Sequence, residues 1–527
     1  MKIEEKKTGA WPRNATRPWR HVALLAVMLL SITVLYSSVT QAYFCANDDF
    51  KALHRAAFED SKWPEHIFTT LELGTFKYRP LSRGLDLLTY RSGGGTALAF
   101  RIRGLLFHEL NVVLLYALGL LLGIPTRAAA AAALLFGIHP LANQSVVGAV
   151  WTVTVSHSVF LGMLVLFVLY TCGRQALVAC AFALLACASL LFYEVNIVVF
   201  GVLYAYLFGV HSIRRGSVDK RALFLLSVAL FASVGLYTGL RLTFVPVDYH
   251  RTVAGIPAPE KIIIAAPSTI IKSVITDAGA LLCPLDPVLA SSLGLPLPSD
   301  AEFRSFLPVV GTLACMVVAA LAILIWKLIR ARRSRPWWFW NTELFLGFTA
   351  LVPLLPVLVF SGHASETYLY LTVAFSMLLV ASIAFEVSGS QRGSGAMRLY
   401  VICVAALAVL YGTATFIRNQ RVVACGNISR RILSSVQFAK FKAGDKLLFT
   451  EVPGGLPSRH YGFYGFTGLD TIRSYSPNTL SYALQLASHN EQISDEPPAV
   501  TTCSVCAAHF WVRSDGAVSE TPPGGHP

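Results

Sequence analysis

Two adjacent carboxylates, Asp48 and Asp49, follow the first long apolar segment of the chain. Neighbouring carboxylates at a membrane surface repel each other, so one tends to hold a proton unless a cation or hydrogen-bond donors offset the repulsion. Such a pair suits a general base that takes the proton from an attacking hydroxyl. The alternative is that Asp48 is a solvated acid or the N-cap of a helix beginning at Phe50. The pair alone leaves both interpretations open.

A second group of residues could bind a phosphate. Tyr78-Arg79-Pro80 lies in the same polar segment as the aspartates, and a guanidinium such as that of Arg79 binds phosphate with two hydrogen bonds. Arg241 ends a later apolar segment, and Lys272 lies in the proline-rich segment after it. Cations that gather at a membrane surface suit the phosphate of a lipid. The alternative for Arg79 is a solvated charge at the start of a helix.

Five more polar residues lie within or at the ends of apolar segments, where ionisable groups are costly and usually face a cavity or one another. They are His108, His139, Glu194, Glu366 and Tyr370. His139, which precedes a proline, could also mark only the end of a helix. Tyr370 could belong to the aromatic belt at the membrane interface. Each is therefore a candidate for a substrate site with a structural alternative.

Cys503-Ser-Val-Cys506 has the spacing of a metal or redox motif. A structural zinc site needs four ligands, and the sequence has one such pair only. A disulfide between the two cysteines, or one that includes Cys425, is the alternative. We therefore predict no protein metal site.

The composition shows in what surroundings these residues must lie. The chain has 527 residues, of which 55% are hydrophobic and only 14% charged, and a mean hydropathy of +0.59. Soluble proteins have roughly 25% charged residues. Apolar runs of about 20 residues recur, and each is long enough to cross a hydrocarbon core about 30 Å thick. A single soluble core is excluded, and we predict an all-α polytopic membrane protein.

The net charge of +14 does not indicate nucleic-acid binding, because the cations cluster at the ends of apolar segments. Basic clusters in short loops mark the cytoplasmic face of a membrane protein. With a cytoplasmic N-terminus, about 11 spans place every strongly basic short loop on that side. The expected spans are 21–44, 102–123, 127–139, 150–171, 175–192, 195–212, 222–242, 304–329, 337–361, 366–386 and 398–417.

We expect a basic cytoplasmic N-terminus over 1–20 and a membrane domain over 21–417. Two outer loops, 45–101 and 243–303, belong to the membrane domain. If Ile262–Leu282 crossed the membrane instead of lying at its surface, the count would be 12 and the C-terminus cytoplasmic. The remaining residues, 418–527, predict a small outer α+β lobe. Within it we expect a short helix over Ile428–Phe438, a strand over Lys446–Val452 and a disordered tail.

In this order, the motifs resemble those of the GT-C superfamily of multispanning glycosyltransferases. The closest likeness is to bacterial relatives of the transmembrane-and-TPR protein O-mannosyltransferases, which use donors of the dolichyl-phosphate-mannose type. The resemblance covers about residues 21–417. It rests most on Tyr78-Arg79-Pro80-Leu81 and on Glu366-Thr-Tyr-Leu-Tyr370, with the acidic pair after the first span and His139-Pro140 after the third.

The resemblance implies an inverting hexosyl transfer, such as mannosyl transfer, from a polyprenyl-phosphate carrier to a protein or glycolipid acceptor outside the cytoplasm. Asp48, with Asp49 as second choice, would deprotonate the acceptor hydroxyl. Arg79, Arg241 and Lys272 would hold the lipid phosphate. His108, His139 and Glu194 would line the pocket. No cofactor is required, although a divalent cation is compatible with the site.

Three other functions are compatible with the sequence. A transporter or lipid flippase would have two related halves that meet at the membrane midplane, and no such repeat is found. An O-antigen ligase or polymerase would rely on a large late outer loop. A catalytically inactive scaffold would fit the absence of an arginine at Thr367, where the family commonly has one. The high alanine content suggests a GC-rich bacterial genome, hence an inner membrane with the site facing the periplasm, whereas a eukaryotic protein would face the ER lumen.

Overall fold

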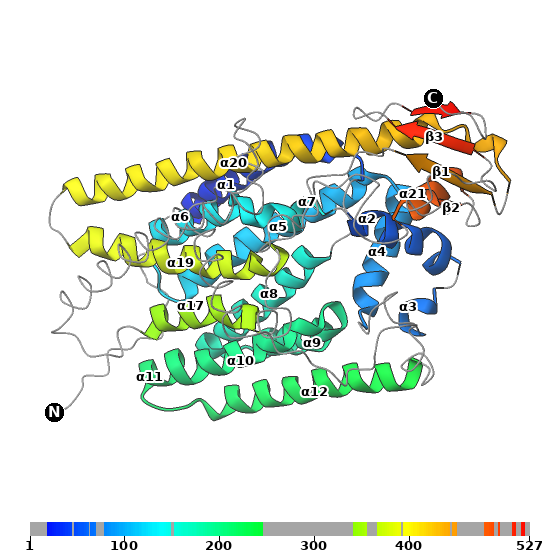
Figure 1. Cartoon of the computed structure of the whole chain (residues 1–527). Coiled ribbons are helices and arrows are strands. Elements are labelled where there is room, and N and C mark those ends of the chain that lie inside the picture. Colours follow the sequence, from blue (N-terminus) through cyan, green and yellow to red (C-terminus); the bar gives the residue numbers. More distant parts are fainter. Residues whose placement is uncertain are drawn as a thin grey trace, which may run out of the picture.

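A computed structural model shows a bundle of long helices with a small lobe at one end (Figure 1). We call this end, which also carries α2 to α4, the loop end. The structure describes residues 18–44, 47–62, 64–69, 78–148, 152–245, 341–355, 366–390, 394–442, 445–450, 479–489, 494–495, 508–512 and 518–521. Within these ranges seven helices are long and apolar enough to cross a membrane, or eight if one bent pair forms a single span.

The bundle helices differ in length, and several continue into 3-10 or π-helical turns. In chain order they are α1 (Pro18–Tyr36, then a 3-10 turn Ser37–Gln41), α5 (Ala97–Leu121), α6 (Thr126–Gly137), a 3-10 turn (Pro140–Ala142), α7 (Asn143–Val147), α8 (Val153–Gly173), α9 (Ala176–Phe192), a 3-10 turn (Glu194–Ile197), α10 (Val198–Ala205), a π-helix (Tyr206–His211), α11 (Ser212–Arg215), α12 (Lys220–Phe244), α17 (Asn341–Leu351, then a 3-10 turn Val352–Leu354), α19 (Glu366–Ser390) and α20 (Ser394–Ser435).

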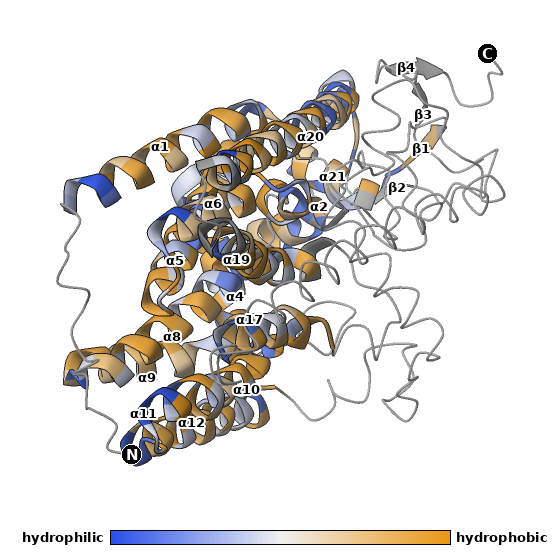
Figure 2. Cartoon of the chain, turned by 90° about the vertical axis from the view of Figure 1, so that its left-hand side faces the viewer, coloured by the Kyte–Doolittle hydropathy of each residue, from blue (hydrophilic) through white to orange (hydrophobic). Residues whose placement is uncertain are grey.

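Large apolar side chains remain exposed along the outer helices. Leu177 on α9 is 81% exposed and Phe231 on α12 is 75% exposed. Figure 2 shows hydrophobic residues along most of the bundle, with hydrophilic ones at α11 and at the start of α1. Such continuous apolar surface is not stable in water and indicates contact with lipid. The chain is an integral multi-pass membrane protein.

The first loop is structured, as expected from its mixed composition. It contains α2 (Asn47–His54), which continues into a π-helix (Arg55–Asp60), and then α3 (His66–Thr69) and α4 (Pro80–Gly93). Proline at the first position of α4 fixes a backbone angle that suits a helix start and lacks the N–H that would have no partner there. Gly94, with φ of 60°, ends α4 in the left-handed conformation.

The C-terminal lobe is α+β, as predicted. A 3-10 turn (Phe438–Lys440) leads from α20 into a four-stranded sheet of order β2-β1-β3-β4, with one helix beside it. Its elements are β1 (Lys446–Thr450), α21 (Thr479–Ser488), β2 (Ser494–Asp495), β3 (Ala508–Val512) and β4 (Val518–Thr521). β1 pairs in parallel with β2 and β3, and β3 pairs antiparallel with β4.

One small hydrophobic core joins the lobe to the first loop. Phe50 of α2, Phe100 of α5 and Ile432 of α20 pack with Leu484 of α21 and Phe510 of β3, all of them buried. Lobe, first loop and helix ends therefore share one packed interior. This core holds α2, which carries the two aspartates, between the bundle and the lobe.

Some expected elements differ from those in the structure. A separate helix over Ile428–Phe438 is wrong, because α20 runs without interruption from Ser394 to Ser435. The third expected span, 127–139, is α6, which bends by 53° into the next helical segment. The expected span 304–329, most of 337–361 and the segment Ile262–Leu282 lie outside the described residues, as does Cys503-Ser-Val-Cys506.

Candidate active site

Arg79 and Glu194 form a bidentate ion pair at the loop end. Arg79 Nε lies 2.7 Å from Glu194 Oε2, and Arg79 Nη2 lies 2.6 Å from Oε1. The guanidinium also lies 4.1 Å from the ring centre of Tyr193, which adds a cation–π contact. Arg79 caps the start of α4, and Glu194 opens the 3-10 turn after α9. The pair therefore joins the first loop to the bundle.

Tyr78 and Arg241 lie beside this pair. The buried Tyr78 ring packs edge-on against Tyr237 of α12, with 5.8 Å between ring centres. Arg241 Nη1 lies 3.5 Å from the Tyr237 hydroxyl, one helical turn away on α12. We call Tyr78, Arg79, Glu194 and Arg241 the arginine cluster. It contains two guanidinium groups and one carboxylate, so it carries a net positive charge that suits an anion.

The hydroxyl of Tyr78 is buried and has no hydrogen-bond partner among the described residues. Burial raises the pKa of Tyr78, and the Arg83 guanidinium offsets part of that effect. The phenol therefore stays protonated and can donate a hydrogen bond at neutral pH. A buried polar group without a partner calls for an explanation, and a ligand that accepts its hydrogen bond is one such explanation.

The two aspartates lie in the first turn of α2, which begins at Asn47 and not at Phe50. Asp49 is fully buried, and its Oδ2 lies 3.7 Å from Arg101 Nη2 on α5. Arg101 in turn donates a 3.0 Å hydrogen bond to the carbonyl of Tyr43. Asp49 thus helps to fasten α2 to the bundle. The side chain of Asp48 lies outside the described part of the structure.

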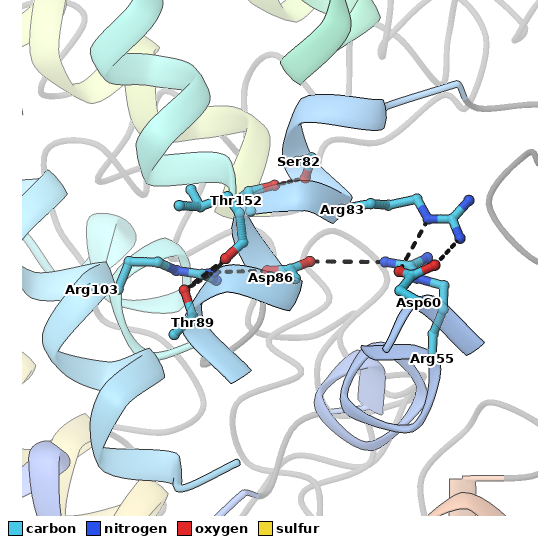
Figure 3. Close-up of polar contacts among 9 residues, drawn as sticks. Arg55, Asp60, Ser82, Arg83, Asp86, Thr89, Arg103 and Thr152 are labelled. Carbon is cyan, nitrogen blue, oxygen red and sulfur yellow. Dashed lines mark hydrogen bonds and ion pairs between the residues drawn. The ribbon is translucent and has the colours of Figure 1, made fainter. Parts of the chain in front are cut away.

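One helical turn along α4 from Arg79 begins a buried ionic network, which we define as Arg55, Asp60, Arg83, Asp86 and Arg103 (Figure 3). Arg83 pairs with Asp60, and Arg103 Nη1 lies 2.8 Å from Asp86 Oδ1. Arg55 lies between the two carboxylates, 3.7 Å from Asp60 and 3.8 Å from Asp86. The network joins the π-helix after α2 to α4 and α5, so it fixes the orientation of the first loop.

Sequence reasoning missed this network, since its members are separated by up to 48 residues. The first loop is rich in both acidic and basic residues, but this composition does not reveal which of them pair. Glu59 lies next to Asp60, and burial raises the pKa of its carboxyl while Arg55 and Arg83 lower it by less. Burial also lowers the pKa of Arg83, although a guanidinium stays charged in proteins.

His108 and Tyr370 hold four bundle helices together. Tyr370 of α19 hydrogen-bonds His108 Nδ1 at 2.6 Å and Asn111 Nδ2 at 3.0 Å, both on α5. His157 of α8 stacks on the Tyr370 ring at 4.6 Å, and His108 Nε2 lies 2.9 Å from the carbonyl of Gly137, which ends α6. His108 and Tyr370 are fully buried, and these contacts satisfy them within the bundle.

His139 lies at the bend after α6. Its Nδ1 accepts a 3.2 Å hydrogen bond from the Leu141 amide, and its ring packs 4.4 Å from that of Tyr411 on α20. The break frees backbone carbonyls, and α20 satisfies them: Thr415 bonds Ile138 at 2.8 Å, and the buried Arg418 bonds Pro140 at 2.5 Å. A broken helix in a membrane needs such partners. Sequence reasoning missed Arg418, whose charge suggested the end of a span.

The side chains of the two remaining predicted residues, Lys272 and Glu366, are not described by the structure. Lys272 lies outside the described residues altogether, whereas Glu366 begins α19. In the described ranges, no three His, Cys, Asp or Glu side chains lie close enough to hold a metal ion. The arrangement thus brings together Tyr78, Arg79, Glu194 and Arg241, and assigns His108, His139 and Tyr370 contacts inside the bundle.

No family model and no curated protein matches this sequence. Among solved structures, the chain is similar to the Archaeoglobus fulgidus oligosaccharyltransferase tethered through a disulfide bond with an acceptor peptide containing the NVT sequon. The TM-score is 0.51 at 12% sequence identity, over 90% of this chain and 64% of that one. The chain therefore spans less than two thirds of the length of the enzyme it resembles. The likeness shows a GT-C fold, as the sequence motifs predicted.

Proposed function

We propose that this protein is a membrane glycosyltransferase that moves a hexose such as mannose from a polyprenyl-phosphate carrier to an acceptor hydroxyl outside the cytoplasm. The observation that carries the proposal is the arginine cluster. Three segments, at residues 78–79, 194 and 241, bring two arginines, a buried phenol and one carboxylate together at the loop end of a GT-C fold.

The arginine cluster suits the phosphate of the donor. Arg241 would bind the phosphate oxygens, and Arg79, held in place by Glu194, would add a second cation. Tyr78 would donate the hydrogen bond that its hydroxyl does not make within the described residues. When the bond from the sugar to the phosphate breaks, the phosphate gains charge, and preorganised cations stabilise that charge. We expect Lys272 to add a further cation from the second outer loop.

Asp48 is the proposed base. It would take the proton of the acceptor hydroxyl while the hydroxyl oxygen forms a bond to the anomeric carbon. The carbon–oxygen bond to the lipid phosphate breaks in the same step, and the phosphate leaves with the electron pair. This displacement inverts the anomeric centre. Asp49 suits this role less, because it is fully buried against Arg101.

The acceptor is proposed to be a protein or a glycolipid. The structural neighbour was crystallised with an acceptor peptide, which supports a peptide as the first acceptor class to try. The short basic loop between α11 and α12, with Arg214, Arg215 and Arg221, lies at the opposite end of the bundle and supports a loop end that faces away from the cytoplasm. We place the protein in a bacterial inner membrane with the arginine cluster on the periplasmic side.

The test is Asp48→Asn, assayed in membranes with a lipid-phosphate-linked sugar. We expect loss of about 10²-fold or more in turnover, because general-base catalysis contributes about 10²–10⁴-fold. Asp219→Asn is the matched control, since Asp219 lies at the far end of the bundle and pairs with Arg174 at 2.9 Å. Unchanged turnover in Asp48→Asn would remove Asp48 from the catalytic role. Chelation of divalent cations should leave the wild-type rate unchanged, because the proposed step uses protein cations alone.

A further inference from the structure

A second site lies at the loop end, apart from the arginine cluster. It is a cavity of about 1180 Å³ between the first loop, α20 and α21. Its walls include Gln41, Tyr43, Phe58, Lys62, Leu98 and Arg430. None of Tyr78, Arg79, Glu194 or Arg241 is among its described lining residues. The cavity is therefore separate from the arginine cluster.

The charge of the cavity is positive. Lys62, Arg430 and His489 line it, and the described lining residues include no aspartate or glutamate. Arg430 lies over the Tyr43 ring at 5.4 Å and donates a 3.4 Å hydrogen bond to the carbonyl of Gln41. Lys62 lies 5.7 Å from the ring centre of Phe58. Aromatic rings thus hold two permanent cations at the wall, which favours an anionic ligand.

One wall of the cavity continues into the lipid-facing surface of α5. Leu98, Ile102, Leu106 and Leu110 follow one another at four-residue intervals and are 41–59% exposed. This spacing places them on one face of the helix, and an exposed apolar stripe on a membrane helix faces hydrocarbon. Leu98 belongs to both the stripe and the cavity wall. A ligand could therefore keep its polar part in the cavity and an apolar chain along α5.

The cavity lies at the level of lipid headgroups. It is lined by Thr40 and Gln41, at the end of the first candidate span, and by Ala97 and Leu98, at the start of the second. The headgroup layers extend a bilayer from about 30 Å to about 40–45 Å in thickness. Positive charge, aromatic rings and an apolar stripe thus meet at one membrane surface.

We propose that this cavity binds an anionic phospholipid of the surrounding bilayer. Arg430 and Lys62 would hold its phosphate, Tyr43 and Phe58 would pack on the glycerol region, and one acyl chain would follow Leu98 to Leu110. A free phosphate would not use the apolar stripe. A zwitterionic lipid such as phosphatidylcholine has the same phosphate, but its choline cation would be repelled by Lys62 and Arg430. The site is independent of the proposed glycosyl transfer.

The test uses the purified full-length protein in a neutral detergent and native mass spectrometry with added phosphatidylglycerol or phosphatidylcholine. We expect the wild type to retain phosphatidylglycerol preferentially. Replacing both cations, Arg430→Gln with Lys62→Gln, should weaken that binding about 25-fold, at about fivefold for each charge near the headgroups. Arg431→Gln is the matched control, because Arg431 is the next residue on α20 and does not line the cavity. It should bind like the wild type.

Equal retention of the two lipids, or equal losses in Arg431→Gln and the double variant, would overturn the proposal. Tighter binding of undecaprenyl phosphate than of phosphatidylglycerol would overturn the proposal and assign the cavity to a carrier lipid. Full displacement of phosphatidylglycerol by inorganic phosphate would overturn it as well and assign the cavity to a free anion. If the double variant does not fold, Lys62→Gln alone serves, since Lys62 is exposed and should still lose about fivefold. Arg241→Gln should keep phosphatidylglycerol binding, which separates this site from a failure of the transferase proposal.

Discussion

The arginine cluster and the ionic network lie one helical turn apart on α4, yet their charges are arranged differently. Arg83, whose amide bonds the carbonyl of Arg79, belongs to a buried network in which three arginines face Asp60, Asp86 and the neighbouring Glu59. Arg79 belongs to a half-buried cluster that contains two arginines and one carboxylate, Glu194, which pairs with Arg79. The buried pairs of the network fix how the helices meet, whereas the half-buried positive charge of the cluster can bind a ligand.

This difference predicts that the two groups fail in different ways when altered. Loss of a network residue should lower stability first, and loss of a cluster residue should lower activity first. The following substitutions test that separation.

The largest effect should come from Asp60→Asn in the ionic network. Asp60 is 1% exposed and pairs with Arg83 and Arg55, so its neutralisation leaves buried cations without their partner. Breaking a buried ion pair in this way costs about 3–5 kcal/mol. Thermal unfolding in detergent should show a large drop in Tm. A change as small as that of Asp219→Asn would mean that the network does not hold the first loop.

Arg241→Gln should have the largest effect on activity within the arginine cluster. Removing one preorganised donor to a developing charge lowers kcat by about 10²–10³-fold, or about 2.7–4 kcal/mol. The Tm should change little, because among the described residues the polar contact of Arg241 is the 3.5 Å approach to the Tyr237 hydroxyl. Arg174→Gln, at the far end of the bundle, is the control for loss of an exposed arginine. Equal activity in the two variants would contradict the cluster's role.

Tyr370→Phe tests a residue of the bundle interior, where a loss of stability without a loss of activity is expected. The change removes the hydroxyl that bonds His108 and Asn111 and leaves both side chains buried without that partner. Such a loss costs about 1–3 kcal/mol. Stability should fall while kcat stays within about twofold, since the hydroxyl is not part of the proposed chemistry. A loss of activity at unchanged Tm would instead indicate that Tyr370 takes part in substrate binding or catalysis.

The smallest effect should come from Glu59→Gln. Because burial raises the pKa of Glu59, the folded protein binds this proton more tightly than the unfolded chain does. Its contribution to stability therefore grows as the pH falls through the folded pKa and is lost as the pH rises. At pH 8 we expect the variant to be more stable by less than about 1 kcal/mol. The difference should shrink in parallel Tm measurements as the pH is lowered toward the ordinary pKa of a glutamate carboxyl group, about 4.3. A difference that grows instead would contradict the assigned sign.

The sequence predicted which face of the membrane the cluster residues share, but not their contacts. Hydropathy and charge placed Arg79 in the first outer loop and Glu194 and Arg241 at the outer ends of spans, and the structure brings the three together. Motif resemblance predicted the GT-C fold, which the structural comparison confirms. The roles of these residues in catalysis stay predictions.

Other features depend on tertiary packing that local patterns do not reveal. Adjacent residues on a helix point about 100° apart, and the sequence alone did not show that Asp49 would be buried. Arg418 resembled the polar end of a span. It is instead buried against the carbonyl of Pro140, where the break in another helix needs a donor.

Because α20 is one uninterrupted helix, it connects the membrane domain to the lobe rigidly. Its 42 residues extend about 63 Å at 1.5 Å per residue. Gly426 lies so close to Tyr43 that an added Cβ would come within 2.8 Å of its backbone, which fixes the rotation of the helix. One residue inserted between Gly426 and Ser435 would turn the lobe by about 100°. The rotation of α20 about its axis thus sets the orientation of the lobe relative to the bundle. Only insertions or deletions of whole helical turns would preserve that orientation.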